Sequence, residues 1–171
     1  MKRISLVLGL CIAVSTGAVS EVIKGKIALS GSILDTPCAI AMDSIDQSID
    51  LGIIPISVLK QWGESPRLPF TIHLMGCRLH SSVGNAWQTF TITFDGPTDN
   101  NGFAVYGQAS GISLVLENRA GQRIQPGVPL QEDTIVMGNR TLEYAIKMVS
   151  SSASYQLGDF ETTLRFKLDY Y

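Results

Sequence analysis

Residues that commonly carry catalysis are scarce in this sequence, because its 171 residues include only two histidines, His73 and His80. The sequence also lacks the GxSxG and HExxH motifs and any glycine-rich loop that could cradle phosphates. His73 falls on the polar face of a predicted strand, which is typical of a surface histidine. Asp46 and Asp50 could suggest a carboxylate pair, but they flank a short predicted strand among turn residues. We therefore expect no enzyme activity, no cofactor and no metal site.

Long hydrophobic runs are also missing after the first 20 residues, where no segment approaches the roughly 18 uninterrupted apolar residues of a transmembrane helix. The chain begins Met-Lys-Arg, continues with the apolar run 4–14, and then becomes small and polar up to Ser20. This pattern predicts a secretory signal peptide over residues 1–20. We place cleavage after Ser20, with cleavage after Ala18 as the alternative.

Basic residues are in the minority. Removal of residues 1–20 takes away two of them, so 11 Lys and Arg remain against 15 Asp and Glu, a net charge of −4. This balance argues against a nucleic-acid partner. The remaining 151 residues suit one domain better than two.

Cysteine is rare as well. Of the three cysteines, Cys11 lies in the predicted signal peptide, so only Cys38 and Cys77 remain in an exported chain. An even pair in an oxidising compartment predicts one disulfide. Closing so long a loop stabilises a domain by roughly 4 kcal/mol in the loop-entropy model. The alternatives are a metal-binding pair and free thiols, and no CxxC motif or nearby histidine cluster supports a metal.

The hydrophobic pattern has period two along most of the chain, which indicates half-buried β-strands. Turn-forming residues separate these runs, and the only helical segment indicated is a short turn near 56–62. Many short strands with such punctuation predict an antiparallel, immunoglobulin-like β-sandwich, hence an all-β fold. The predicted core-facing residues are Phe70, Ile72, Leu74, Phe90, Ile92, Phe94, Ile112, Leu114, Leu116, Leu142, Tyr144, Ile146, Met148, Leu164, Phe166, Leu168 and Tyr170.

Both ends of the exported chain are strand-like. The N-terminal stretch has Gly25 and Gly31 on one parity with four aliphatic residues, and at the other end a strand pattern runs to the last residue. Natural proteins usually protect such apolar edges, so one offered strand and one accepting edge would fit β-strand addition between molecules. The alternative is that these are the first and last strands of a complete sandwich. The four aliphatic residues are Ile23, Ile27, Leu29 and Ile33.

Several short runs along the mature chain make it resemble a pilin of the chaperone/usher pathway. They include the run 29–33, Cys38 and Cys77 at the separation usual in that family, and the run 46–52. The remaining ones are 94–96, 109–112, Gly158 at the fourteenth position from the end, and the penultimate Tyr170.

The resemblance implies an incomplete immunoglobulin-like β-sandwich over residues 36–171, which a donor strand from a partner completes. The donor strand of this chain would be the extension 21–35, with Ile23, Ile27, Leu29 and Ile33 inserting and Gly31 as the family's glycine. The chaperone-facing groove edge would be residues 160–171, with its terminal carboxylate held by basic chaperone residues. The positions that the resemblance assigns to this edge are Gly158, Leu164, Phe166, Leu168, Tyr170 and Tyr171.

The partners implied by the resemblance are a periplasmic chaperone, an outer-membrane usher and neighbouring pilus subunits. The implied location is a fimbrium at the cell surface, reached through the periplasm, where the subunit polymerises and supports adhesion. One alternative is a subunit with its own receptor-binding role, since Trp62 and Trp87 could stack on sugar rings, although both fall in loop-like stretches where packing is the commoner role. The other is a terminator that anchors the pilus, which the run 38–43 and the ending Asp169-Tyr170 resemble.

Overall fold

The computed structural model describes residues 27–31, 33, 35–80, 84 and 86–171. By its internal contacts the chain divides into two units, residues 1–33 and 34–171. In the first unit the described residues, 27–31 and 33, belong to no helix or strand. A strand needs a hydrogen-bonded neighbour to be stable. Ile23 and the predicted signal peptide lie outside the described residues.

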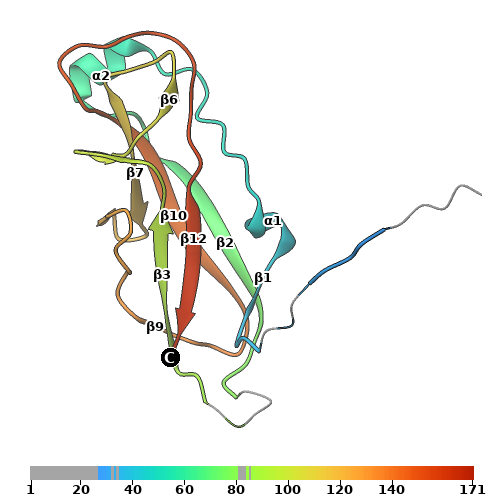
Figure 1. Ribbon diagram of the computed structural model, residues 1–171. Helices are drawn as coiled ribbons and strands as arrows, with labels where there is room; N and C mark the ends of the chain where they lie inside the picture. Colours follow the sequence, from blue (N-terminus) through green and yellow to red (C-terminus); the bar gives the residue numbers. More distant parts are fainter. Residues whose placement is uncertain (1–26, 32, 34, 81–83, 85) are drawn as a thin grey trace, which may run out of the picture. The chain divides into compact units, whose positions relative to one another are not determined.

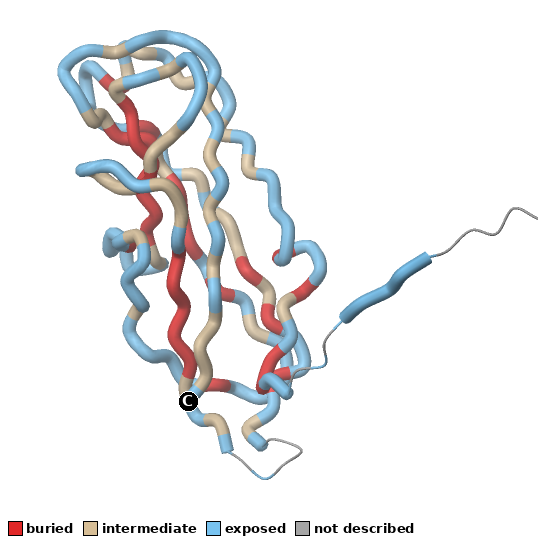
Figure 2. The backbone as a smooth tube through the Cα atoms, viewed as in Figure 1, coloured by how far each residue is buried: buried red, intermediate tan, exposed pale blue. Residues whose placement is uncertain are grey.

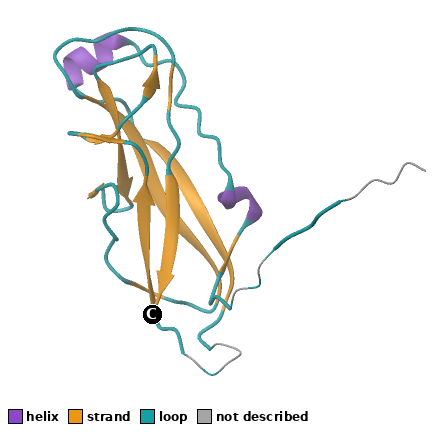
Figure 3. Cartoon of the chain, in the orientation of Figure 1, coloured by secondary structure: helices purple, strands orange, loops and turns teal. Residues whose placement is uncertain are grey.

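The second unit, which we call the body, is built from antiparallel strands in three sheets (Figures 1 and 3). One sheet has the order β1-β2-β10-β7-β5-β4, with β8 also paired to β7. A second has the order β12-β3-β9, and β11 pairs with β6. The strands are β1 (Ala39–Ile40), β2 (Leu68–Cys77), β3 (Thr89–Asp95), β4 (Thr98–Asp99), β5 (Gly102–Phe103), β6 (Tyr106–Gly107), β7 (Ile112–Asn118), β8 (Arg123–Ile124), β9 (Asp133–Thr134), β10 (Gly138–Ser150), β11 (Phe160–Glu161) and β12 (Arg165–Tyr170).

The core of the body follows the predicted alternation. The apolar faces predicted for the runs in β2, β3, β7 and β10 meet in one cluster, while those of β12 pack against it. An aromatic group lies at its centre, with the rings of Phe94 and Tyr144 4.9 Å apart and nearly perpendicular. Burial and the nearby Asp133 raise the pKa of Tyr144 to about 12. The period-two prediction of the core is therefore confirmed.

The expectation of half-buried strands is wrong for β3 and β7, which are buried on both faces (Figure 2). On β3 the second face carries Thr91 and Thr93, and both threonines are buried. The chain after β8 runs beside this strand, since the backbone N–H of Gly127 bonds to the carbonyl of Phe94 and that of Leu130 to Ile92. Burial of both faces depends on the tertiary fold, which local periodicity cannot show.

Two short helices interrupt the strands: α1 (Met42–Ile45) and α2 (Ile56–Trp62). The helical turn predicted near 56–62 is confirmed as α2, which ends where Gly63 takes a left-handed conformation and its N–H bonds to the carbonyl of Leu59 at 2.9 Å. Trp62 is thus the last helical residue, and its placement in a loop-like stretch is wrong. Among the described residues, no helix is long and apolar enough to cross a membrane.

The short strand predicted between Asp46 and Asp50 is also wrong, because residues 46–55 form a coil that runs from α1 to α2 (Figure 3). Within the described chain, no backbone–backbone hydrogen bond joins residues 46–54 to another segment. Alternating apolar residues produce a strand only where a neighbouring strand completes the ladder.

The predicted disulfide is present between Cys38 and Cys77, 39 residues apart in sequence. It lies where β1 pairs antiparallel with β2, with Ala39 opposite Met75. The bond therefore ties the start of the body to a central strand of its larger sheet.

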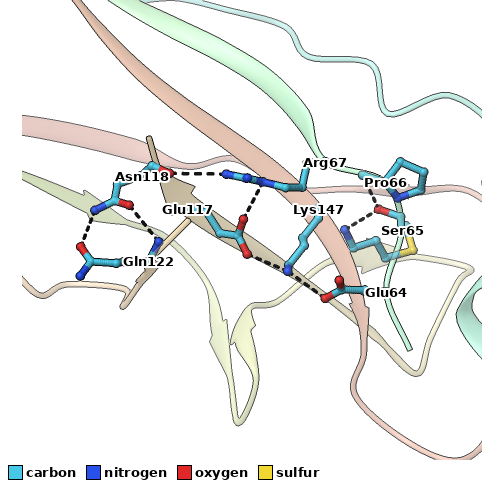
Figure 4. A network of polar contacts seen from close by, with 9 residues as sticks. Glu64, Ser65, Pro66, Arg67, Glu117, Asn118, Gln122 and Lys147 are labelled. Atoms are coloured by element: carbon cyan, nitrogen blue, oxygen red, sulfur yellow. Dashed lines mark hydrogen bonds and ion pairs between the residues drawn. The ribbon is translucent and has the colours of Figure 1, made fainter. Parts of the chain in front are cut away.

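A charged network lies where β7, β10 and the chain before β2 meet (Figure 4). Glu117 is 7% exposed, and its carboxylate contacts Arg67 and Lys147, each at 2.7 Å. The Lys147 ammonium also contacts Glu64 at 2.8 Å. Hydrogen bonds to Glu117 and then Glu64 raise the pKa of Lys147 despite its partial burial.

Glu117→Gln is expected to lower the free energy of unfolding by roughly 1–3 kcal/mol, because it removes the charge that pairs with two cations in a buried position. Because the pKa of Lys147 is higher in the folded state, its stabilising contribution is complete below pH 10.5 and is lost as pH rises through the folded pKa. Urea unfolding at pH 8 and pH 11 measures both effects. Glu143→Gln is the control, since Glu143 pairs with an exposed arginine, Arg119; an equal loss in both variants would contradict the prediction.

Candidate functional site

A groove of about 1090 Å³ opens into the core of the body. The end of α1 and the coil that follows it, residues 44–54, contribute one part of its lining and the segment 155–166 another. Side chains of the core from four strands also line it, so the groove reaches the core of the sandwich. These core residues are Phe70, Ile72, Phe94, Ile112, Leu114, Leu116, Ile146 and Met148.

Among the described residues, hydrogen bonds join the first wall to β2 at its beginning. The backbone N–H of His73 bonds to the Ser44 hydroxyl at 2.9 Å, and the Gln47 amide donates to the carbonyl of Thr71 at 2.8 Å. Further along, the Asp50 carboxylate accepts the N–H of Gly52, which is a local turn contact. Most backbone groups of this wall are therefore free to pair with another chain.

The second wall leads into β12. β12 pairs with β3 from Arg165 opposite Asp95 to Tyr170 opposite Phe90, and it is the outermost strand of its sheet. Its edge facing away from β3 has no strand partner among the described residues. An unpaired edge of this kind is a template for strand addition.

The C-terminus is held in place by β3. The Tyr171 N–H bonds to the carbonyl of Thr89 at 2.9 Å, and a Tyr171 carboxyl oxygen accepts the N–H groups of Gln88 and Thr89. The Tyr170 ring lies 6.3 Å from that of Phe90, and burial raises the pKa of Tyr170. The last residues thus continue the ordered edge of the sheet.

Gly158 also lines the groove, where its backbone passes close to Gln108. Its φ of +147° is one that other residues rarely adopt, and a Cβ at this position would lie 2.4 Å from the Cβ of Gln108. Only glycine fits such an approach without moving the backbone. Gly158 therefore shapes one end of the groove and does not belong to the edge strand.

The residues assigned to the groove edge from the sequence fall into two groups. Gly158, Leu164 and Phe166 line the groove. Leu168 and Tyr170 lie further along β12, half-buried against the core, and Tyr171 is exposed. The expected continuous strand 160–171 is wrong in detail, because β11 pairs with β6 and residues 162–164 separate it from β12.

The opposite wall of the groove was not predicted from the sequence. Ile49, Leu51 and Ile54 are partly buried against the core there, while Ile53 is almost fully exposed. The alternation of Ile49, Leu51 and Ile53 is a usable signal, but the strand predicted from the sequence covered only the residues between Asp46 and Asp50. In chemical terms the site is an apolar groove between two backbone edges, which suits an extended peptide. Within the described ranges, no group of three or more His, Cys, Asp or Glu residues could hold a metal ion.

The extension residues that the structure describes carry exposed aliphatic side chains. Ile27, Leu29 and Ile33 are each more than 85% exposed. Gly31 has open space around the position that a Cβ would occupy, so the single chain does not require glycine there.

Comparisons with known proteins bear on this arrangement. No family model matches the chain. It is 34% identical over 151 residues to the Fimbria A protein of Serratia marcescens, covering 85% of this chain and 84% of that protein. It is also 28% identical to the Major MR/P fimbria protein of Proteus mirabilis (strain HI4320), covering 99% and 98% of the two chains.

Solved structures agree with the sequence relatives. The crystal structure of the P pilus rod subunit PapA superposes with a TM-score of 0.70 at 28% identity, covering 80% of this chain and all of that one. A subunit in the structure of a chaperone–usher pilus gives a TM-score of 0.69 at 25% identity, covering 86% and 96% of the two chains. The chain belongs to the family of chaperone–usher fimbrial pilins and is a structural pilus subunit with an incomplete immunoglobulin-like sandwich.

Proposed function

We propose that the groove accepts the N-terminal extension of a neighbouring pilus subunit and that the extension 21–35 of this chain enters the groove of another. The observation that carries this proposal is the opening of the core beside the unpaired edge of β12. An inserted strand would cover the core and pair its backbone with β12 and with the coil 46–54. One extended segment would therefore both cover the apolar core and satisfy the unpaired backbone groups.

The dimensions of the two parts support the proposal. Eleven residues from Ile23 to Ile33 span roughly 33 Å at about 3.3 Å per residue. The wall 157–166 has a similar length on the same scale. Burying four aliphatic side chains contributes roughly 6 to 12 kcal/mol before the cost of ordering the strand. A joint of this strength would open slowly, as a surface fibre requires.

The finer assignments of partner and location belong to the same proposal. Before assembly, a periplasmic chaperone covers the groove and pairs with the edge formed by β12, with basic residues that hold the terminal carboxylate. At an outer-membrane usher the extension of the next subunit then replaces it. The product is a fimbrium on the cell surface, and the subunit supports adhesion without catalysis. The exposed apolar residues of the lining, Ile53 and Leu157 among them, support the proposal that a partner covers the groove at every stage.

Leu168→Glu is expected to abolish co-purification of the subunit with its chaperone, because the half-buried Leu168 side chain lies on the core side of the accepting edge. A carboxylate there faces an apolar environment that cannot satisfy it. Lys167→Glu is the matched control, since Lys167 is exposed on the opposite face of β12. Affinity purification from periplasmic extracts measures the captured fraction. Equal capture of both variants would show that the edge of β12 is not the chaperone-binding strand.

A further inference from the structure

Three exposed apolar side chains lie at the end of the body that carries its disulfide. Cys38 is fixed there by its disulfide to Cys77, and the preceding Pro37 accepts the N–H of Arg78 at 2.8 Å. Met75 lies opposite Ala39, and Gly138 lies opposite Cys77, which brings residues 136 and 137 to the same end. We call this set the root patch: Met75, Val136 and Met137, which are 42%, 58% and 71% exposed.

A second exposed apolar pair lies at the other end of the groove, beside α2. Ile53 precedes α2 by three residues and is 98% exposed, and Leu157 on the opposite wall is 71% exposed. The Tyr155 hydroxyl contacts the hydroxyl of Ser150 at 2.6 Å, which in turn contacts the carbonyl of Leu59 in α2. In the body, Figure 1 shows α2 at one end and β1 with the C-terminus at the other. We call Ile53 and Leu157 the mouth pair.

The few residues between the inserted extension and Cys38, which we call the tether, limit how far apart the root patch and the mouth pair of neighbouring copies can lie. Every strand pair that the structure describes is antiparallel, so we take an inserted extension to run antiparallel to β12. Its last inserted residue, Ile33, then lies at the α2 end of the groove. Five residue steps separate Ile33 from Cys38, which span at most roughly 17 to 18 Å. The first residues of the body that donates the extension must therefore lie within roughly 18 Å of Ile33 at the α2 end of the accepting groove.

We propose that the root patch of one copy of this chain packs on the mouth pair of the copy that holds its extension. The inference rests on the proposed function, because it assumes that the extension occupies the groove. Its partner is a second copy of this chain, and the contact continues the groove interface beyond the inserted strand. Apolar side chains exposed at both ends of the body become buried together.

The test is cross-linking within assembled fibres. Met137→Cys and Leu157→Cys are introduced into the full chain, fibres are assembled, and a short thiol-reactive cross-linker is added. A covalent ladder is expected to form about tenfold faster than in the control pair Val128→Cys and Leu157→Cys, because only groups that the tether brings together gain effective concentration. Val128 is exposed but lies beside the middle of β3. Equal rates, or no ladder with Met137→Cys, would overturn the proposed contact.

A second variant separates the contact from strand insertion. Met137→Glu places a charge in the root patch and leaves the groove unchanged, so uptake of a peptide of residues 21–35 stays at the wild-type rate. Opening of fibre joints in mild denaturant is expected to be about tenfold faster, equivalent to 1.4 kcal/mol. An unchanged opening rate refutes the root contact, whereas failure of the wild-type chain to take up the peptide refutes the strand exchange on which the contact depends.

Discussion

A peptide of residues 21–35 is expected to bind the mature subunit and raise its unfolding midpoint, whereas the same peptide without Ala28 is expected to bind 100-fold to 10,000-fold more weakly, in order of magnitude. Deleting Ala28 moves Leu29 and Ile33 to the opposite parity from Ile23 and Ile27, so no register inserts all four. Losing two aliphatic side chains removes roughly 3 to 6 kcal/mol of burial.

The matched control is Ala28→Ser in the same peptide, because residue 28 faces away from the inserting side and the change preserves length. Competition with chaperone-bound subunit, followed by native electrophoresis, measures uptake. Comparable binding of the deleted and intact peptides would mean that the groove does not select for aliphatic side chains on one face of the inserted strand. An ordinary self-contained sandwich would then be the better account of the body.

Gly31→Leu in the same peptide tests whether the accepting groove requires glycine at this position. Space is open at Gly31 in the single chain, so any need for glycine arises only against an accepting groove. Uptake is expected to slow sharply because a side chain cannot enter where two backbones approach closely.

Loss of the disulfide is the second large effect. Replacing both Cys38 and Cys77 by serine is expected to lower the free energy of unfolding by about 4 kcal/mol, since closure of this loop no longer restricts the unfolded chain. That loss is comparable with the whole net stability of many domains. The amount of folded subunit recovered from the periplasm, together with urea unfolding, measures it.

Cys11→Ser is the control for this pair, because residue 11 belongs to the predicted signal peptide and would be absent from an exported chain. Mass spectrometry of the non-reduced wild type should show no free thiol at Cys38 or Cys77. Full recovery of the double serine variant at wild-type stability would contradict the expected role of the bond.

Much of the body could be predicted from the sequence because its strands obey local alternation. Phe70, Ile72 and Leu74 face the core as their parity indicates, and the same holds for the other long strands. The second buried faces could not be found this way. The segment that pairs with the backbone of β3 lies more than 30 residues further along the chain, and the charges that contact Glu117 come from two other parts of the chain.

The groove shows the same division. Its edge strand was predictable, because Phe166 and Leu168 repeat the period-two pattern up to the last residues. Its opposite wall carries the same pattern at Ile49 and Leu51, yet forms no strand, since a pattern states which face is apolar but not whether a partner is present. Local sequence cannot distinguish a paired strand from an unpaired segment that could pair with a strand of another chain.

The disulfide determines how a pulled fibre would transmit force. Tension along an inserted extension enters the body at Cys38, next to β1, which pairs with its neighbour over only two residues. Without the disulfide, so short a strand would separate from β2 as its few hydrogen bonds broke one after another. The bond to Cys77 carries the load directly into β2, a ten-residue strand held along most of its length by β10. The load is thus shared by many hydrogen bonds in shear, and the joint resists forces that would unzip an unlinked terminus.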